Sequence, residues 1–394
     1  MKLSFLSNST EMGFMGVTFI TGLAIAFLVP VLSVFLTDEL QVRPLLVGLF
    51  FTANAIAGIV VGQILAHYSD RMTTRKPLII FCGLAGVVGS LLYAYDRHYL
   101  VLATVGVLLM SICGSITPQL YALAREYTDS QNKIAVTFST VMRAQFSLAW
   151  VIGPPLAFFI IARFTFANLF TGVALLYVMC AGIIYLKLPS LPKKQISTPA
   201  NKISMLQNKP LLLLFMGSFF MWTCNSMYLI TMPVYISKLL HWPQNEAGWL
   251  MGLAAGLEIP VMLLAGKYSQ RWGNDRLLII SAVAAILFYV VLMSTQNMQL
   301  LFAAQLLNAT FIGIIAGIGM TVFQDLMPGY AGQASTLFSN SIRCGGIISG
   351  TLAGVITEYW GYHGVFLCAF ILAVISFVII LAFRKSHHIG LVTE

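Results

Sequence analysis

The stretch FSTVMR at residues 138–143 returns 200 positions later as FSNSIR at residues 338–343, inside an equally apolar segment. A second pair keeps the same offset, because YSDR at residues 68–71 is matched by YSQR at residues 268–271. Spacing shared by segments this hydrophobic predicts that the chain holds two copies of one membrane unit. In transporters built from such repeats, the substrate binds at the interface between the copies.

The composition is that of a chain surrounded by lipid. Of its 394 residues 59% are hydrophobic and only 9% are charged, whereas a soluble globular protein carries roughly a quarter charged residues. The net charge of +9 is spread over short loops between apolar segments, which argues against binding of nucleic acid. The six cysteines lack the spacing of metal ligands, and no catalytic motif is present. We therefore expect no metal, no cofactor and no enzyme activity.

Twelve apolar runs are each long enough to cross a bilayer as a helix, which takes about 20 residues. The sequence predicts an all-α membrane protein with twelve transmembrane helices in two pseudosymmetric six-helix bundles. The predicted spans are 13–36, 44–67, 77–95, 99–124, 136–162, 166–187, 210–237, 246–269, 276–295, 298–324, 334–357 and 362–383.

One connection, residues 189–209, has the composition of a linker, with proline, serine and lysine and no apolar run. It separates six predicted spans from six. We therefore predict an N-terminal bundle at residues 1–188, a flexible cytoplasmic linker at 189–209 and a C-terminal bundle at 210–394.

The lysine and arginine residues indicate an orientation in the membrane. If the N-terminus is cytoplasmic, sixteen of the 22 lie in cytoplasmic connections and four lie outside. Cytoplasmic loops of membrane proteins carry the excess of these residues, so we predict that both termini are cytoplasmic. The remaining two, Arg143 and Arg343, lie within predicted spans.

Arg143, Glu258 and Arg343 are ionisable residues well inside predicted spans. An ionised side chain at mid-bilayer costs at least ~2.5–3.5 kcal/mol on insertion scales, so such a residue normally faces a cavity or a partner. A carboxylate whose protonation depends on which side is open suits a proton-coupled exchanger, which makes Glu258 a candidate. A static ion pair that holds the bundles together is the alternative. Asp325 is a second candidate for proton coupling, although a charge at a helix end would also account for it.

The connection between the second and third predicted spans resembles the Gly-x-x-x-Asp-Arg-x-Gly-x-Arg-Arg loop of the major facilitator superfamily. Neither copy is complete, since Ala66 and Thr73 replace the glycines of the first copy and Gln270 replaces the acid of the second. In the family the acid meets the positive end of a helix in the other bundle and closes the cytoplasmic side. A plain positive-inside loop is the alternative. The residues to which the resemblance assigns gating are Asp70, Arg71, Arg75 and Arg271.

The fifth predicted span contains Gly153-Pro154 between two small residues, Ala149 and Ala157. This resembles the fifth-span motif of the exporters in the same superfamily, with alanines at two family glycines. Proline removes a backbone hydrogen bond and kinks the helix, while small neighbours allow a second helix to approach. We assign Gly153 and Pro154 to gating, with a simple kinked packing helix as the alternative.

The whole chain resembles the bacterial sugar efflux transporters of this superfamily. The resemblance rests on LVGLFFTANAIAGI (46–59), PQLYALAREYTD (118–129), FSTVMRAQFSLAWVIGPPLAF (138–158), MGLAAGLEIPVMLLAG (251–266) and FIGIIAGIGMTVFQDLMPG (311–329). It implies proton-coupled efflux of glucosides or galactosides, such as lactose-like sugars, by alternating access. It also implies the inner membrane of a Gram-negative bacterium as the location.

Recognition of a sugar calls for neutral donors and acceptors and for a flat apolar face under the ring. For any single amide, a hydrogen bond between helices is an equally good interpretation. The predicted substrate-binding residues are Asn54, Gln119, Arg143, Trp150, Asn225, Tyr228, Asn308 and Arg343.

The closest alternative function is that of a proton-linked multidrug exporter of the same superfamily. Drug sites are usually richer in aromatic residues and poorer in amides, which argues slightly against it. A channel or a receptor on a transporter scaffold is the alternative of a different class. The expected partners are a small sugar, protons and the lipid bilayer, and we expect a monomer.

Overall fold

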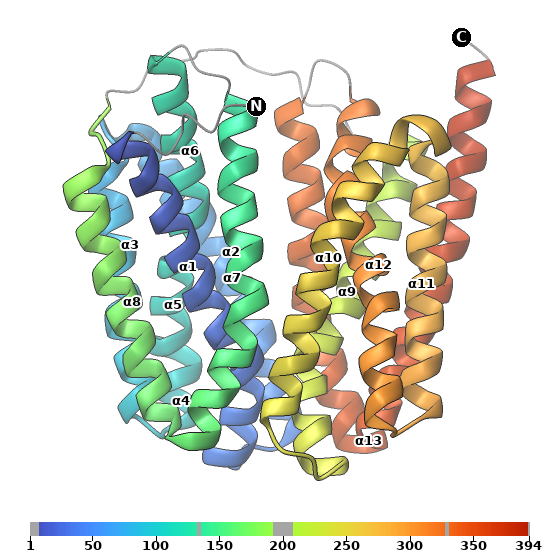
Figure 1. Cartoon of the computed structure of the whole chain (residues 1–394), viewed down its shortest axis with the longest axis horizontal. Helices are drawn as coiled ribbons and strands as arrows, with labels where there is room; N and C mark the ends of the chain where they lie inside the picture. The colour runs from blue at the N-terminus through green and yellow to red at the C-terminus, as the bar shows by residue number, and fades with distance from the viewer. Residues whose placement is uncertain (1–7, 132–134, 192–207, 328–330, 393–394) are drawn as a thin grey trace. The chain divides into compact units, whose positions relative to one another are not determined.

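The computed structural model describes residues 8–131, 135–191, 208–327 and 331–392. Helices are the only regular elements within these residues (Figure 1). Eleven of them in this part of the chain are long and apolar enough to cross a membrane. The all-α membrane class is therefore confirmed.

Contacts between the helices divide the chain into two compact units. Unit 1 comprises Met1–Val42, Ala53–Ile196 and Trp242–Gly252, and unit 2 comprises Arg43–Thr52, Ser197–His241 and Leu253–Glu394. Two helices pass from one unit into the other. The predicted linker 189–209 lies largely outside the described residues, so the bundle boundaries 1–188 and 210–394 remain a prediction.

The helices of the first half follow the predicted spans closely. They are α1 (Ser9–Val34), η2 (Phe35–Glu39), α2 (Pro44–Arg71), α3 (Lys76–Tyr95), α4 (Tyr99–Val101), η3 (Leu102–Gly106), α5 (Val107–Cys113), α6 (Ile116–Ser130), α7 (Ala135–Arg163) and α8 (Phe166–Lys187). Within unit 1, α1 packs against α7 and α8, and α3 packs against α8.

The second half contains fewer and longer elements. They are α9 (Lys209–Val234), η5 (Tyr235–Leu239), α10 (Asn245–Trp272), α11 (Asn274–Ser294), α12 (Met298–Asp325) and α13 (Ala331–Val392). Within unit 2, α13 packs extensively against α9 and also against α11, which packs on α12.

The count of eleven apolar helices differs from the predicted twelve because spans 334–357 and 362–383 both fall in α13. An apolar stretch of 54 residues is more than twice the length that one crossing needs. Gly361 interrupts it with a φ of 69°, a conformation that glycine adopts without steric cost. The chain reverses there, since the last part of α13 runs back from its label in Figure 1 to the C-terminal mark.

The duplication seen in the sequence is repeated in backbone detail. Asn8 caps the start of α1 by accepting a hydrogen bond from the Thr10 amide, and Asn208 caps α9 in the same way from Leu211. Each of these helices ends in a five-residue π-helical turn, η2 or η5. Each turn is followed by a residue with positive φ, Gln41 at 52° and His241 at 54°. Such rare features at an offset of 200 residues follow from two copies of one fold.

A small residue allows α7 to pack closely on α1 in unit 1. A Cβ atom built on Gly153 would overlap the side chain of Ala26, and one built on Gly22 would lie 3.0 Å from the Cβ of Ala149. The predicted role of Gly153 and its small neighbours in close helix approach agrees with this packing.

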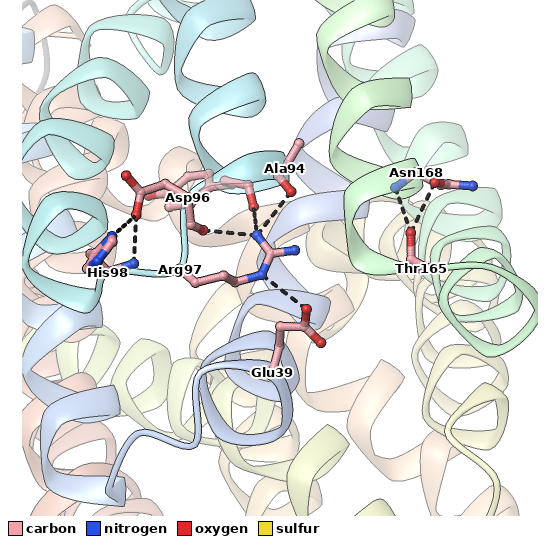
Figure 2. A network of polar contacts seen from close by, with 8 residues as sticks. Glu39, Ala94, Asp96, Arg97, His98, Thr165 and Asn168 are labelled. Atoms are coloured by element: carbon pink, nitrogen blue, oxygen red, sulfur yellow. Dashed lines mark hydrogen bonds and ion pairs between the residues drawn. The ribbon is translucent and has the colours of Figure 1, made fainter.

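The turn between α3 and α4 carries an ionic network within unit 1 (Figure 2). Arg97 donates from Nε to Glu39 at 3.0 Å and from a terminal nitrogen to the carbonyl oxygens of Tyr93, Ala94 and Asp96. These carbonyls belong to the end of α3, where cations are stabilising. The backbone amide of His98 donates to Asp96 at 2.6 Å and holds the pKa of that carboxyl below its usual value. The network joins the end of η2 to the end of α3.

Candidate functional site

Arg143 and Arg343 lie on equivalent faces of α7 and α13. At 3.6 residues per turn, positions seven and eleven residues further on lie within about 20° of the same face. For Arg343 these positions are Gly350 and Gly354, which contact the first turns of α2 inside unit 2. For Arg143 the position eleven residues on is Pro154, whose carbonyl oxygen contacts Gly248 of α10 inside unit 1.

Both arginines are exposed in the isolated chain. Further along, the face that carries each arginine is covered by a neighbouring helix. Arg143 also interacts electrostatically with Tyr121 of α6, a residue that sequence reasoning did not select.

Glu258 lies in the middle of α10 and is half-buried. Its backbone oxygen is only 3.0 Å from where a Cβ on Gly313 of α12 would lie, and Gly317 contacts Met262 one turn further on. These two glycines let α10 and α12 pack closely. At the repeat position of Glu258 in α2, a Cβ on Gly58 would meet nothing within 4 Å.

The static ion pair considered for Glu258 is not formed with Arg343. Among the described residues, Glu258 has no hydrogen bond or ion pair, and neither has Arg343. An unpaired carboxylic acid at this depth is stable when it carries a proton or faces water.

Tyr228 and Asn308 belong to a buried polar cluster in unit 2. The hydroxyl of Tyr228 donates to Oε1 of Gln305 at 3.1 Å, and Nδ2 of Asn308 donates to the same oxygen at 3.1 Å. Tyr228 also packs edge-on against Phe288 and is 1% exposed. This geometry favours the alternative in which the amides join α9 to α12, while Oδ1 of Asn308 keeps no partner in the described structure.

Gln119 is buried in a second network, in unit 1. Its Oε1 accepts hydrogen bonds from Ser69 at 2.7 Å and from Arg75 at 2.8 Å. Arg75 also donates from Nε to Glu126 at 2.8 Å. The predicted gating residue Arg75 is thereby tied to α6, and Gln119 holds its guanidinium. Sequence reasoning missed Ser69 and Glu126, although both lie in stretches that carried the family resemblance.

Asp325 is exposed at the last residue of α12. Its carboxylate accepts a hydrogen bond from Asn274 at 3.2 Å. Asn274 begins α11, so this contact joins the start of α11 to the end of α12 in unit 2. In unit 1 the ion pair between Arg75 and Glu126 makes the corresponding link, from the start of α3 to the last turns of α6. The position favours the alternative of a helix-end charge.

The remaining predicted residues have simpler surroundings. Asn54, Trp150 and Asn225 are half-buried within α2, α7 and α9. Pro154 is buried in α7, whereas Arg71 and Arg271 are exposed near the ends of α2 and α10. The side chain of Asp70 lies outside what the structure describes, so its predicted contact remains a prediction.

Comparisons with known proteins agree on one family. The sequence profile described as Major Facilitator Superfamily matches residues 14–298 and 214–392. Sugar efflux transporter A of Dickeya chrysanthemi is 50% identical over 365 residues, which cover 92% of this chain and 93% of that protein. Sugar efflux transporter A of Escherichia coli K12 is 48% identical over 374 residues, with 94% of each chain covered.

A solved structure of the nucleoside transporter NupG shares the fold. It superposes with a TM-score of 0.80 and covers 96% of this chain and 99% of the other, at 16% sequence identity. Because the sequence identity is so low, this similarity supports the fold and carries no information about the substrate.

Proposed function

Since this chain belongs to the Major Facilitator Superfamily and, within it, to the sugar efflux transporters, we propose that it exports small glucosides or galactosides by alternating access, in exchange for protons. The observation that carries this proposal is the identity of 45–50% to three curated sugar efflux transporters over nearly the whole chain. The proposed location is the inner membrane of a Gram-negative bacterium, with both termini in the cytoplasm.

In this proposal the two arginines bind sugar hydroxyl groups. A guanidinium presents five N–H donors in a fixed plane and keeps its charge at any physiological pH. The exposure of Arg143 and Arg343 on equivalent helix faces supports this role. Asn54, Trp150 and Asn225, which are half-buried, are proposed to complete the site.

Glu258 is proposed to carry the coupled proton. The absence of a partner for its carboxylate in the described structure supports this assignment, because nothing holds it permanently ionised. The proton would enter when Glu258 faces the outside and leave when it faces the cytoplasm.

Closure of the cytoplasmic side is proposed to depend on the loops after α2 and α10. Asp70 and Arg71 in the first copy and Arg271 in the second would form the closing contacts, as in the family. The bonds of Arg75 to Gln119 and Glu126 support a loop that is held rigidly against α6.

Counterflow with purified protein in liposomes tests the proposed substrate class. Vesicles loaded with unlabelled lactose, other galactosides, glucosides, pentoses or amino acids are diluted into labelled lactose. We expect galactosides and glucosides alone to drive transient uptake of label. Inhibition by lipophilic cations without exchange of any sugar would contradict sugar efflux and indicate a multidrug exporter.

Arg343→Gln is expected to raise the KM for the exported sugar at least about tenfold, because a charge-assisted hydrogen bond contributes about 1.5–3 kcal/mol. Arg343→Lys keeps the charge but loses the planar fork, so an intermediate KM is expected. Efflux kinetics from loaded cells measure both. Arg384→Gln, in the part of α13 beyond the turn at Gly361, is the matched control and should leave KM unchanged. Equal KM values in all three variants would remove Arg343 from the site.

A further inference from the structure

The last two turns of α10 carry two cations and two aromatic rings on one face of the helix. These residues, which form the α10 patch, are Lys267, Tyr268, Arg271 and Trp272. At 3.6 residues per turn, their positions fall within about 140° of one another. Lys267, Arg271 and Trp272 are exposed, and Tyr268 is half-buried. The whole patch belongs to unit 2.

The two rings and the ammonium group of the α10 patch form one continuous surface. The rings of Tyr268 and Trp272 are stacked, with centroids 5.0 Å apart and planes inclined by 25°. Nζ of Lys267 lies 5.9 Å from the centroid of the Tyr268 ring, within the range of cation–π attraction. In the part of the chain that the structure describes, neither Lys267 nor Arg271 forms an ion pair. Two positive charges therefore lie beside the stacked rings without a carboxylate partner among the described residues.

The repeat-related face of α2 in unit 1 lacks half of this arrangement. His67 and Met72 stand where the second copy has a lysine and a tryptophan, so a permanent charge and the second ring are missing. The first copy also has an acid, Asp70, at the position of Gln270. The second copy thus carries more positive charge and more aromatic surface than the first.

The first copy uses a cation of its loop inside the unit. Arg75 donates to Glu126 and to Gln119 and thereby ties the loop to α6. In the second copy Asp275 and Leu326 occupy the positions of Arg75 and Glu126, so no such bond can form. Packing of the loop therefore accounts for Arg75 in unit 1 but for neither cation of the α10 patch.

An exposed apolar band precedes the α10 patch. Leu263 and Leu264 lie one turn before it and are 71% and 51% exposed. Leu264 lies on the same face of the helix as the patch, at an angle between those of Lys267 and Tyr268. In a membrane helix, apolar side chains contact acyl chains, while tyrosine, tryptophan and lysine lie at the level of the headgroups. The polarity along this face therefore follows that of a lipid molecule.

The end of α10 lies on the same side of unit 2 as the C-terminal end of α13 (Figure 1). This is the side that the distribution of lysine and arginine predicts to be cytoplasmic. The cytoplasmic leaflet carries a negative surface potential, which attracts each lysine or arginine close to it. The predicted orientation thus brings the α10 patch to an anionic surface.

We propose that the α10 patch binds the headgroup of an anionic phospholipid such as phosphatidylglycerol, whose acyl chains lie against Leu264. The guanidinium of Arg271 can donate to two oxygens of the phosphate, and Lys267 contributes a second charge. The stacked rings pack against the glycerol backbone, where apolar and polar groups meet. A choline or ethanolamine headgroup brings its own positive charge, which the two cations repel. This binding goes beyond the proposed export and does not depend on it.

Quenching of Trp272 fluorescence by brominated lipids measures occupation of the α10 patch. Purified protein is reconstituted into phosphatidylcholine bilayers with increasing fractions of brominated phosphatidylglycerol or brominated phosphatidylcholine. The chain has six tryptophans, so the signal of Trp272 is the difference between the parent and Trp272→Phe. We expect half-maximal quenching at a fraction of phosphatidylglycerol about fivefold lower than that of phosphatidylcholine, as the attraction of a cation to anionic lipid predicts. Equal quenching by the two lipids would overturn the proposal.

Lys267→Gln should remove most of the preference for phosphatidylglycerol, whereas Lys267→Arg should keep it. Lys209→Gln is the matched control, because Lys209 is exposed at the start of α9, also in unit 2. The control should keep the preference of the parent. A loss of equal size in both glutamine variants would show diffuse attraction to the bilayer and overturn a site at α10. Arg271 is kept in every variant, because a change there would also affect the proposed closure of the cytoplasmic side.

Free glycerol phosphate distinguishes a lipid site from a site for soluble phosphate compounds. A large excess in solution should leave the quenching by phosphatidylglycerol unchanged, because it has no acyl chains to lie against Leu264. Displacement of the lipid by glycerol phosphate would overturn the lipid as the occupant. No sugar takes part in these measurements, so failure of every sugar in counterflow would reject the proposed export without deciding the lipid site.

Discussion

Glu258→Gln is expected to abolish proton-driven accumulation of sugar in inverted vesicles while counterflow of the same sugar continues. Glutamine keeps the shape and hydrogen-bonding capacity of protonated glutamate but cannot release a proton. Exchange of sugar for sugar needs no net proton movement, whereas accumulation does. We expect accumulation to fall at least about tenfold, to the level measured with an uncoupler.

Two variants separate this outcome from a general loss of folding. Glu246→Gln makes the same chemical change in the first turn of the same helix and should leave accumulation intact. Glu258→Asp keeps an ionisable group and should keep partial accumulation. Undiminished accumulation by the Glu258→Gln protein would rule out this residue as the proton carrier, whatever the counterflow result.

Gly48→Ala is expected to destabilise the protein more than any other single methyl group added to α2. The new Cβ would meet backbone atoms of Gly350 and Gly354, which cannot rotate away as a flexible side chain can. Overpacking of this kind costs about 1–3 kcal/mol and separates the helices locally. We therefore expect a lower apparent Tm in detergent.

Gly58→Ala is the matched control, since it lies in the same helix and its Cβ would meet nothing within 4 Å. Alanine is favoured over glycine in a helix by about 1 kcal/mol at either position. The control should therefore keep or raise the apparent Tm, and the difference between the two variants isolates the contact with α13. Equal Tm values would show that α2 and α13 are not packed as closely as this geometry requires.

The membrane-spanning helices were predictable because lipid leaves the backbone few alternatives. An apolar run of sufficient length must satisfy its own hydrogen bonds as a helix, so composition alone locates the spans. The repeat was equally visible, since a 200-residue offset in the sequence reappears in the caps at Asn8 and Asn208 and in the positive φ angles of Gln41 and His241. The number of apolar helices was eleven and not the predicted twelve, because Gly361 turns the chain between the last two spans without a polar loop.

The candidate site was only partly predictable. Charge inside a span identified Arg143, Glu258 and Arg343, because an ionisable residue is costly in lipid wherever it points. The amides carried no such signal. Gln119 and Asn308 look alike in the sequence, yet one holds Arg75 and the other completes a cluster with Gln305. Arg75 lies 44 positions from Gln119, and Tyr228, which bonds to Gln305 in that cluster, lies 77 positions from it. Partners separated like these become known only when the helices are packed.

The sequence by itself determined the membrane class, the duplication and the family, since hydropathy and repeat spacing are properties of single residues and of their order. Tertiary structure alone decided that Glu258 has no partner in the described residues, that Asp325 bonds to Asn274, and that Arg43 reaches Glu358. Residues 315 positions apart meet there because three glycines let two helices touch. That distance of approach depends on the shape of both helices, which no local pattern in either one specifies.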